Sequence, residues 1–388
     1  MGASRAAGGV TTGRLPSLDG LRGVAALVVV VYHCMLVWPT LADPVYTDRE
    51  VPGSRLDWWL VHTPLRALWA GEEAVSVFFV LSGVVLTLAA QRAGFSWRAY
   101  YPSRLVRLYL PVWVSLVLAV GWYLLLPEEP VPGAGTWLNA HVGSLTASNL
   151  LGDLVLIGGT STLNGPLWSL RWEVLFSLGL PLYLLAGCRW PRLWPLVVVL
   201  TVVTTAVGAV AGRGWLFYLP VFALGTLVAV HLDSLRALAQ RIERRPRPGL
   251  VWGSLFSISL VVLVLRWLAI AVDAPPLVLH VLYVLSPLSA TVLVVLAALW
   301  PAAVRLLTTR PAAWLGTVSF SLYLVHEPLV VALAFQLDGG PLVLVGLLAL
   351  PLSLGYGWLF YRWVERPGHR LANRVGAWRP RRPAREPM

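Results

Sequence analysis

Two polar residues of the first apolar segment, Arg22 and His33, could bind and activate a substrate. They are eleven positions apart, so on an α-helix they point within about 20° of the same direction and lie about 16.5 Å apart along the axis. A charge inside a bilayer costs several kcal/mol unless it faces a cavity or a partner. The spacing favours an elongated ligand held at both ends. The alternative is an arginine that reaches the membrane surface and a histidine with a structural role.

A second polar group, Arg104 and Arg107, lies at the start of a later apolar segment, shortly after Arg92 and Arg98. Positions i and i+3 share a helical face, and guanidinium groups bind phosphates through paired hydrogen bonds. These residues predict a phosphate-binding site. The alternative is the general excess of arginine in cytoplasmic loops, which explains the same cluster equally well.

Two further segments carry polar residues on one helical face. In the first, Ser169 and Glu173 are four positions apart and follow Trp168. In the second, Tyr323 and His326 are three positions apart. Such spacings bring side chains together on a helix, so both sets could line a polar cavity. The alternatives are an aromatic anchor at the membrane interface and a buried histidine with only a structural role.

Metal and cysteine chemistry are not expected. No two histidines or cysteines have the close spacing of a zinc site. Cys34 directly follows His33, and adjacent helical residues do not face each other, so a Cys–His nucleophile is not expected. Cys188 falls on the opposite side of the membrane in the predicted topology, so we expect no disulfide with Cys34.

The elements that must position these residues are membrane-spanning helices. The chain has 388 residues, of which 57% are hydrophobic and 12% charged, and its mean hydropathy is +0.72. Soluble domains carry about 25% charged residues. A span needs roughly 20 apolar residues, and the chain divides into ten such runs, near 20–38, 73–90, 105–126, 166–186, 194–211, 214–232, 250–272, 279–300, 313–335 and 341–363. We expect an all-α polytopic membrane protein, with the more polar residues 136–165 forming an interfacial or re-entrant segment.

The distribution of arginine orients these helices. Of the 30 basic residues, all arginines, 24 fall on the side of the two termini and 6 on the other. Cytoplasmic loops accumulate positive charge, so both termini are predicted to be cytoplasmic. The net charge of +12 is thereby explained by topology, and nucleic-acid binding is not expected. The polar N-terminus precedes an apolar stretch without a small-residue cleavage pattern, which argues against a removed signal peptide.

In their order along the chain, these motifs resemble the acyltransferase-3 family of membrane acyl-CoA-dependent O-acyltransferases. The matching segments are Leu18-Asp-Gly-Leu-Arg-Gly with His33, Ser76-Val-Phe-Phe-Val-Leu-Ser-Gly83, Arg104-x-x-Arg107 with Pro111, Asn164-x-x-x-Trp168-Ser-Leu-x-x-Glu173, Leu315-Gly-x-x-Ser-Phe-Ser-Leu-Tyr-Leu-x-His326 and Glu365-x-Pro367. The chain departs from the family pattern at Val174, where an acidic residue or glutamine is usual, and at Glu327, where a bulky apolar or aromatic residue is commoner.

The resemblance implies an O-acyltransferase that uses acyl-CoA, with acetyl as the default acyl group, and no permanently bound cofactor. We expect Arg22, Arg104 and Arg107 to hold the phosphates of acyl-CoA. His33 is expected to be the catalytic base, with Glu173 orienting or charge-balancing the site. An acyl-histidine intermediate is the rival mechanism. The side chains expected to line an acceptor pocket are Trp168, Ser169, Tyr323 and His326.

The acceptor is expected to be a hydroxyl of a glycan, such as a surface polysaccharide, of a glycolipid or of a glycosylated natural product. We expect a bacterial plasma membrane protein with a cytoplasmic segment at 1–17, a transmembrane acyltransferase domain at 18–367 and an arginine-rich cytoplasmic tail at 368–388. Two alternatives remain open: a transporter or flippase for a lipid-linked saccharide, and a structural membrane protein. Neither inverted repeats nor broken helices, which mark many transporters, are visible in the sequence.

Overall fold

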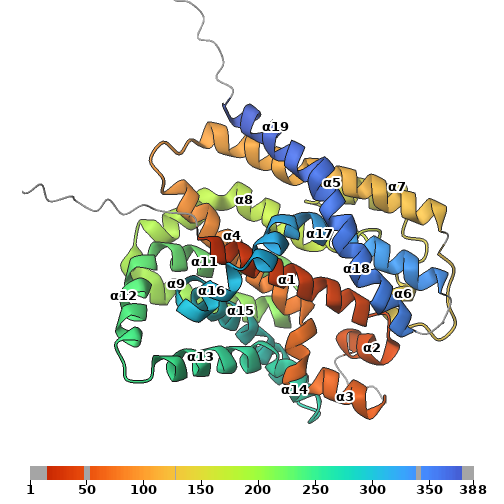
Figure 1. Cartoon of the computed structure of the whole chain (residues 1–388), viewed down its shortest axis with the longest axis horizontal. Coiled ribbons are helices and arrows are strands. Elements are labelled where there is room, and N and C mark those ends of the chain that lie inside the picture. The colour runs from red at the N-terminus through yellow and green to blue at the C-terminus, as the bar shows by residue number, and fades with distance from the viewer. Residues whose placement is uncertain (1–14, 48–52, 127, 338–341, 378–388) are drawn as a thin grey trace, which may run out of the picture.

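The computed structural model describes residues 15–47, 53–126, 128–337 and 342–377, which form helices with no strand among them. Eight of the helices are long and apolar enough to cross a membrane. They are α1 (Pro16–Met35), α4 (Gly71–Ala90), α5 (Trp97–Leu125), α8 (Leu167–Cys188), α9 (Trp194–Val210) together with the 3₁₀ turn Pro191–Leu193 before it, α15 (Pro276–Leu299), α17 (Arg310–Gln336) and α18 (Leu342–Phe360) together with the helical turns that continue it, packed as one bundle (Figure 1). The predicted all-helical fold is confirmed for the described residues, and the eight long apolar helices are consistent with a membrane protein.

The remaining two predicted spans are less regular. Residues 214–232 form α10 (Gly214–Tyr218) and α11 (Val221–Val230), and the chain then bends by 67° into α12 (Leu232–Glu243), so this unit is at most a ninth span among the described helices. Residues 250–272 form α13 (Pro248–Leu263), only 16 residues long, and the short α14 (Leu265–Ile270). Since a span needs roughly 20 residues, the tenth crossing stays a prediction.

Proline residues set the starts of several helices. Pro16, Pro276 and Pro311 lie in the first turns of α1, α15 and α17, and Pro301 in that of α16 (Pro301–Leu307). The first turn suits proline because its missing N–H would have no partner there and its fixed φ is already helical. Asp19 in the first turn of α1 adds a favourable interaction with the helix dipole.

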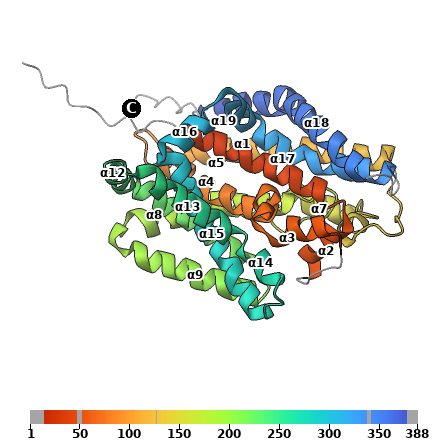
Figure 2. The same ribbon diagram turned by 60° about the horizontal axis from the view of Figure 1, so that its bottom comes forward.

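The parallel pair of α1 and α17 forms the centre of the bundle, and both views show the two helices side by side (Figures 1 and 2). Glycines allow the close approach. A Cβ at Gly23 would overlap the backbone at Gly316, and a Cβ at Gly316 would overlap the backbone at Asp19. Small residues are what lets two helix backbones meet in a membrane. The glycines of two of the family-like motifs therefore serve packing.

A second close contact joins α4 to α11. A Cβ at Gly83 would overlap the carbonyl of Phe222, and one at Gly225 would overlap the carbonyl of Val80. Burial then falls from the centre outwards: 89% of the most apolar stretch of α17 is buried, against 17% for α9. A helix that is apolar all round is either enclosed or lipid-facing, so α17 is the best-fixed platform for a site.

We name the two ends of the bundle after the α1 residues Arg22 and His33: the arginine end, where α1 begins, and the histidine end. At the arginine end, α18 continues through a π-helical turn (Tyr361–Glu365) into α19 (Arg366–Ala377). There α19 packs antiparallel to α5, with Gly376 against the backbone of Ala99. Residues 368–377, within the predicted tail, are thus helical, while residues 1–14 and 378–388 lie outside the described residues.

Short helices cover the histidine end. They are α2 (Pro39–Thr47), α3 (Arg55–His62) and the 3₁₀ turn Pro64–Trp69 from the connection after α1, and α6 (Thr136–Asn139) and α7 (Ala147–Val155) from the connection after α5. We call residues 128–165 the cap segment. It contains the residues predicted to be interfacial or re-entrant, and it contacts the last turn of α1 at His33 and α17 at Glu327.

Candidate active site

His33 and His326 meet at the histidine end, where the last turn of α1 crosses α17. Nδ1 of His33 lies 2.9 Å from Nε2 of His326 and 3.0 Å from the carbonyl oxygen of Val29. Nδ1 of His326 lies 2.9 Å from the carbonyl oxygen of Leu322. The sequence assigned His326 to an acceptor pocket; the structure brings it directly to His33.

These contacts determine where the protons of the neutral pair lie. A carbonyl oxygen only accepts hydrogen bonds, so Nδ1 of each histidine carries its proton. Nε2 of His326 is then an acceptor for the N–H of His33. Nε2 of His33 is left unprotonated, and no hydrogen bond to another described residue engages it. Since His33 is half-buried while His326 is fully buried, the free nitrogen belongs to the more accessible ring.

Aromatic rings enclose His33. The ring of Trp137, from α6 in the cap segment, lies 5.9 Å from that of His33, and the ring of Tyr32 lies 5.1 Å from it. Trp137 is 4% exposed. The cap segment therefore forms one wall around the imidazole and limits the access of water to it.

Next to this pair lies a buried ion pair that the sequence did not reveal. Nε2 of His141, in the cap segment, lies 3.1 Å from a carboxylate oxygen of Glu327 in α17, and the two side chains are 4% and 3% exposed. Burial lowers the pKa of His141, but the hydrogen bond and charge of Glu327 outweigh it and raise that pKa overall. Glu327 stood out in the sequence only as a departure from the family pattern, and His141 carried no signal.

The chain around Asn164 joins the cap segment to α17. Pro328 has no N–H, so the carbonyl of Leu324 one turn earlier loses its helical partner. The Nδ2 group of the fully buried Asn164 donates to this carbonyl at 3.1 Å. The next residue, Gly165, donates its N–H to Glu327 at 2.6 Å, and a Cβ at this position would overlap the Glu327 carboxylate. Asn164 thus provides the hydrogen bond that Pro328 cannot donate to the Leu324 carbonyl, close to the two histidines.

The predicted acceptor residues lie one turn further into the bundle. The hydroxyl groups of Ser169 and Tyr323 are 2.6 Å apart and buried, and the Tyr323 ring lies 6.1 Å from that of His326. Trp168 points to another side, where its ring lies 5.0 Å from that of Tyr218 in α10. The structure therefore groups Ser169, Tyr323 and His326 and separates Trp168 from them.

Glu173 lies deeper still and interacts with Arg104. The carboxylate of Glu173 accepts hydrogen bonds from Arg104 and, at 2.8 Å, from Ser82. Nε of Arg104 also donates to Ser177 at 3.1 Å. The predicted span began near residue 105, but α5 begins at Trp97, which places Arg104 two turns inside the helix. Among the described residues, Glu173 bonds to these partners and not to His33.

A series of polar side chains thus runs along the apolar bundle. It is built on α8, where Ser169, Glu173 and Ser177 recur every four residues on one face. At one end Ser169 reaches Tyr323 beside His326, and at the other Ser177 reaches Arg104. We call this series the polar chain.

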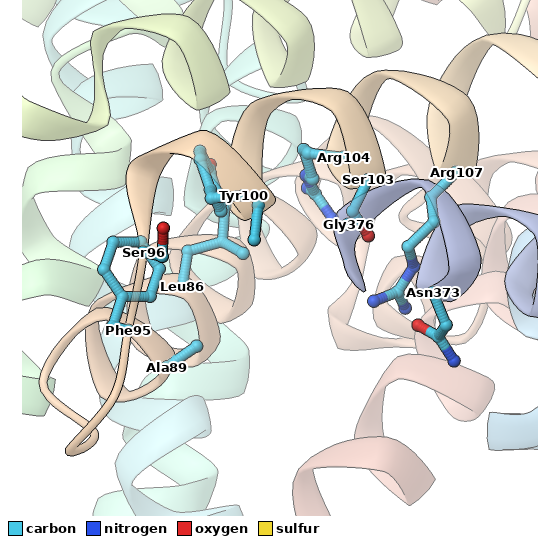
Figure 3. A pocket seen from close by; sticks show the side chains of 11 residues that line it. Leu86, Ala89, Phe95, Ser96, Tyr100, Ser103, Arg104, Arg107, Asn373 and Gly376 are labelled. Carbon is cyan, nitrogen blue, oxygen red and sulfur yellow. The ribbon is translucent and has the colours of Figure 1, made fainter. Parts of the chain in front are cut away.

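The arginine end of the polar chain opens into a pocket of about 340 Å³. Figure 3 shows its walls, which come from the ends of α4 and α5, the loop between them, and α19. Arg104 and Arg107 lie on one side, Phe95 and Tyr100 on the other, and Arg107 extends toward Asn373 of α19 (Figure 3). Within the described residues no hydrogen bond or ion pair engages Arg107, so its donors are available to a ligand.

Arg22 adds a further positive charge at the arginine end. It is 33% exposed, forms an ion pair with Asp19 at 3.5 Å, and is close enough to Arg107 for the two charges to interact. The three predicted phosphate-binding arginines therefore lie at one end, and His33 at the other. Glu365, in the π-helical turn that follows α18, anchors this end by accepting hydrogen bonds from the hydroxyl and the N–H of Ser321 in α17. Among the described residues no three histidine, cysteine or acidic side chains form a group that could hold a metal ion.

Comparisons with known proteins identify the chain as an acyltransferase. A family model for an acyltransferase domain, of the acyltransferase-3 type, matches residues 15–362. Acyltransferase MdmB of Streptomyces mycarofaciens is 32% identical over 183 residues, which cover 47% of this chain and 42% of that protein. O-acetyltransferase PaAT-1 of Phomopsis amygdali is 26% identical over 407 residues, covering 88% of this chain and 79% of that protein. No solved structure matches the chain. Because the family model spans most of its length, this chain belongs to the acyltransferase-3 family.

Proposed function

We propose that this protein transfers an acyl group from acyl-CoA to a hydroxyl of a carbohydrate or glycosylated natural product. The observation that carries the proposal is the polar chain, which runs from an arginine-lined pocket to Tyr323, next to the His33–His326 pair. A donor with phosphates at one end and a reactive thioester at the other matches such a site. Acyl-CoA has this form.

The pocket suits the nucleotide part of the donor. Arg107 has free donors for a phosphate, and charged hydrogen bonds of this kind contribute about 1.5–3 kcal/mol each. Arg104 and Arg22 add positive charge at the same end, although each is partly neutralised by an acidic neighbour. The rings of Phe95 and Tyr100 offer an aromatic wall for the base. We assign this end to the cytoplasm, where acyl-CoA is made.

The histidine end suits the transfer itself. Nε2 of His33 takes the proton of the acceptor hydroxyl as its oxygen attacks the thioester carbonyl, and the resulting imidazolium returns that proton to the departing CoA sulfur. General bases of this kind contribute about 10²–10⁴-fold to rates. His326 accepts the N–H of His33 and thereby orients the ring and stabilises its charge. In the rival mechanism the same nitrogen carries the acyl group covalently.

The names of relatives support the acyl class. The Phomopsis amygdali protein is named an O-acetyltransferase, which favours acetyl as the group and oxygen as the acceptor atom. The proposed acceptor is a hydroxyl of a glycan, a glycolipid or a glycosylated natural product. We further propose a bacterial plasma membrane location with both termini cytoplasmic, supported by the eight long apolar helices and the arginine distribution.

The test supplies purified protein in lipid nanodiscs with acetyl-CoA labelled in the acetyl group. With an extract of candidate acceptors we expect CoA release and label in an O-ester on the acceptor. Label held on His33 in the absence of acceptor would replace direct transfer by the acyl-histidine route. Movement of a lipid-linked saccharide without thioester cleavage would instead establish the transporter alternative.

A further inference from the structure

We propose that the His141–Glu327 ion pair is a positioning device that holds the cap segment closed over His33 and directs the acyl group to the acceptor instead of water. The inference rests on the proposed function. It concerns residues that touch neither the donor pocket nor the reacting nitrogen, and it assigns a role to the residue at which the chain departs from its family.

The contacts of His141 fit a charged pair. Nδ1 of His141 lies 2.9 Å from the carbonyl oxygen of Trp137, and Nε2 lies 3.1 Å from Glu327. Because a carbonyl accepts only, Nδ1 donates. With Glu327 ionised, Nε2 must donate as well, so His141 carries two protons and a positive charge. This differs from His33 and His326, whose contacts fit neutral rings.

Glu327 brings together three parts of the chain. One carboxylate oxygen receives the His141 N–H of the cap segment, and the other receives the N–H of Gly165 at the entry to α8. The residue before it in α17 is His326, whose Nε2 contacts His33. A single buried carboxylate therefore fixes the cap segment, the α8 entry and the partner of the catalytic base relative to one another.

The same ion pair also fixes Trp137, the aromatic ring of the cap segment that lies against His33. Trp137 lies one helical turn before His141, is bonded to it through the backbone, and its ring lies 5.0 Å from the His141 ring. The Trp137 ring also lies 5.9 Å from the ring of His33. Displacing His141 from Glu327 would consequently move the ring that shields His33.

The chemical consequence follows from competition for the acyl group. A thioester activated beside a general base can react with a sugar hydroxyl, giving the ester and CoA, or with water, giving the free acid and CoA. Closing a site expels water and suppresses such side reactions. A displacement of about 1 Å in a site can cost about 10²-fold in rate. Loosening the cap segment should slow transfer and favour hydrolysis.

The test compares four variants of the full-length protein in nanodiscs: Glu327→Gln, His141→Gln, the double variant, and Gly165→Ala, which crowds the Glu327 carboxylate without changing either partner. Matched controls are Glu129→Gln, an exposed carboxylate of the cap segment, and His280→Gln, whose ring bonds only its own helix. Three quantities are measured: kcat for acyl transfer, KM for acetyl-CoA, and the fraction of released acetyl found as acetate.

For both single variants and Gly165→Ala we expect kcat to fall about 10–100-fold, the acetate fraction to rise several-fold, and KM for acetyl-CoA to stay within about twofold of the wild type. The double variant should lose less than the two single losses combined, because it buries no unpaired charge. Both controls should resemble the wild type.

The inference is overturned if Glu327→Gln and His141→Gln fold and retain the kcat and acetate fraction of the controls. It is also overturned if KM and kcat change together without added hydrolysis, which would mark a purely structural pair. Absence of acyl transfer in the wild type would instead refute the proposed function. In that case hydrogen exchange of residues 136–165 in the same variants still reports whether the pair holds the cap segment closed.

Discussion

The ion pair between Arg104 and Glu173 gives the most informative single perturbation. Both side chains are 16% exposed, and each has one further partner, Ser177 for the arginine and Ser82 for the glutamate. The role expected from the sequence, in which Glu173 assists His33 at the catalytic site, and a role as counter-ion of Arg104 make different predictions. We therefore consider Arg104→Gln, Glu173→Gln and the double variant.

The burial of the Arg104–Glu173 pair determines how much stability each variant should lose. Removing one partner of a buried pair leaves an unpaired charge and costs about 3–5 kcal/mol. The lost hydrogen bond to Ser177 or Ser82 adds about 1 kcal/mol. Arg104→Gln should show the full effect, because Glu173 is held inside the bundle, whereas Glu173→Gln should be milder, because Arg104 can turn into the pocket it lines. The double variant buries no charge and should recover most of the loss.

The assay is unfolding by SDS titration in mixed micelles, paired with kcat and KM for acetyl-CoA. Arg236→Gln is the control, since its ion pair with Asp233 is exposed, with Asp233 84% accessible, and such pairs contribute about 0–1 kcal/mol. The reasoning would be refuted if Glu173→Gln kept full stability and unchanged KM but abolished kcat. That outcome would make Glu173 a catalytic group and not a counter-ion.

Three further predictions concern the donor pocket, the central helix pair and pH. Arg107→Ala should raise KM for acetyl-CoA about 10–100-fold, the equivalent of one charged hydrogen bond, and leave the stability to unfolding unchanged. An unaltered KM would show that the phosphates of acetyl-CoA bind at another site. Gly23→Ala should destabilise by about 1–3 kcal/mol through overlap with α17, whereas Gly253→Ala, which meets nothing within 4 Å, should stabilise α13 by up to about 1 kcal/mol. Because the pKa of His141 is raised in the folded protein, the stability contributed by its protonated form is complete below about pH 6.5 and is lost as pH rises through the raised value. In the wild type, hydrogen exchange of residues 136–165, corrected for intrinsic rates, should become faster over that pH range. Glu327→Gln should show no such step.

The helices and the two ends of the site follow from local patterns in the sequence. Apolar runs of span length and the eleven-residue spacing of Arg22 and His33 are properties of single helices, and the structure keeps Arg22 beside the other predicted phosphate-binding arginines and His33 at the far end. The motif glycines were visible as a resemblance, but their physical reason, backbone contact between α1 and α17, required the packed bundle.

Partnerships between distant segments could not be predicted. His141 and Glu327 are separated by 186 positions, and their pairing depends on the path of the cap segment, which has no periodicity. The pairing of Arg104 with Glu173 was missed because the hydropathy of residues 97–104 is too low to mark them as helix, although α5 begins at Trp97. Pro102 and the flanking arginines lower the apolar content of that segment without breaking the helix.

The central claim is that His33 activates an acceptor hydroxyl for transfer from acyl-CoA. The most direct measurement is the initial rate of CoA release from acetyl-CoA by wild type and His33→Gln in nanodiscs, with and without acceptor, at equal donor saturation. The account predicts acceptor-dependent release by the wild type and a loss of about 10²–10⁴-fold in His33→Gln, with KM for acetyl-CoA unchanged. Equal release by the two proteins would contradict it.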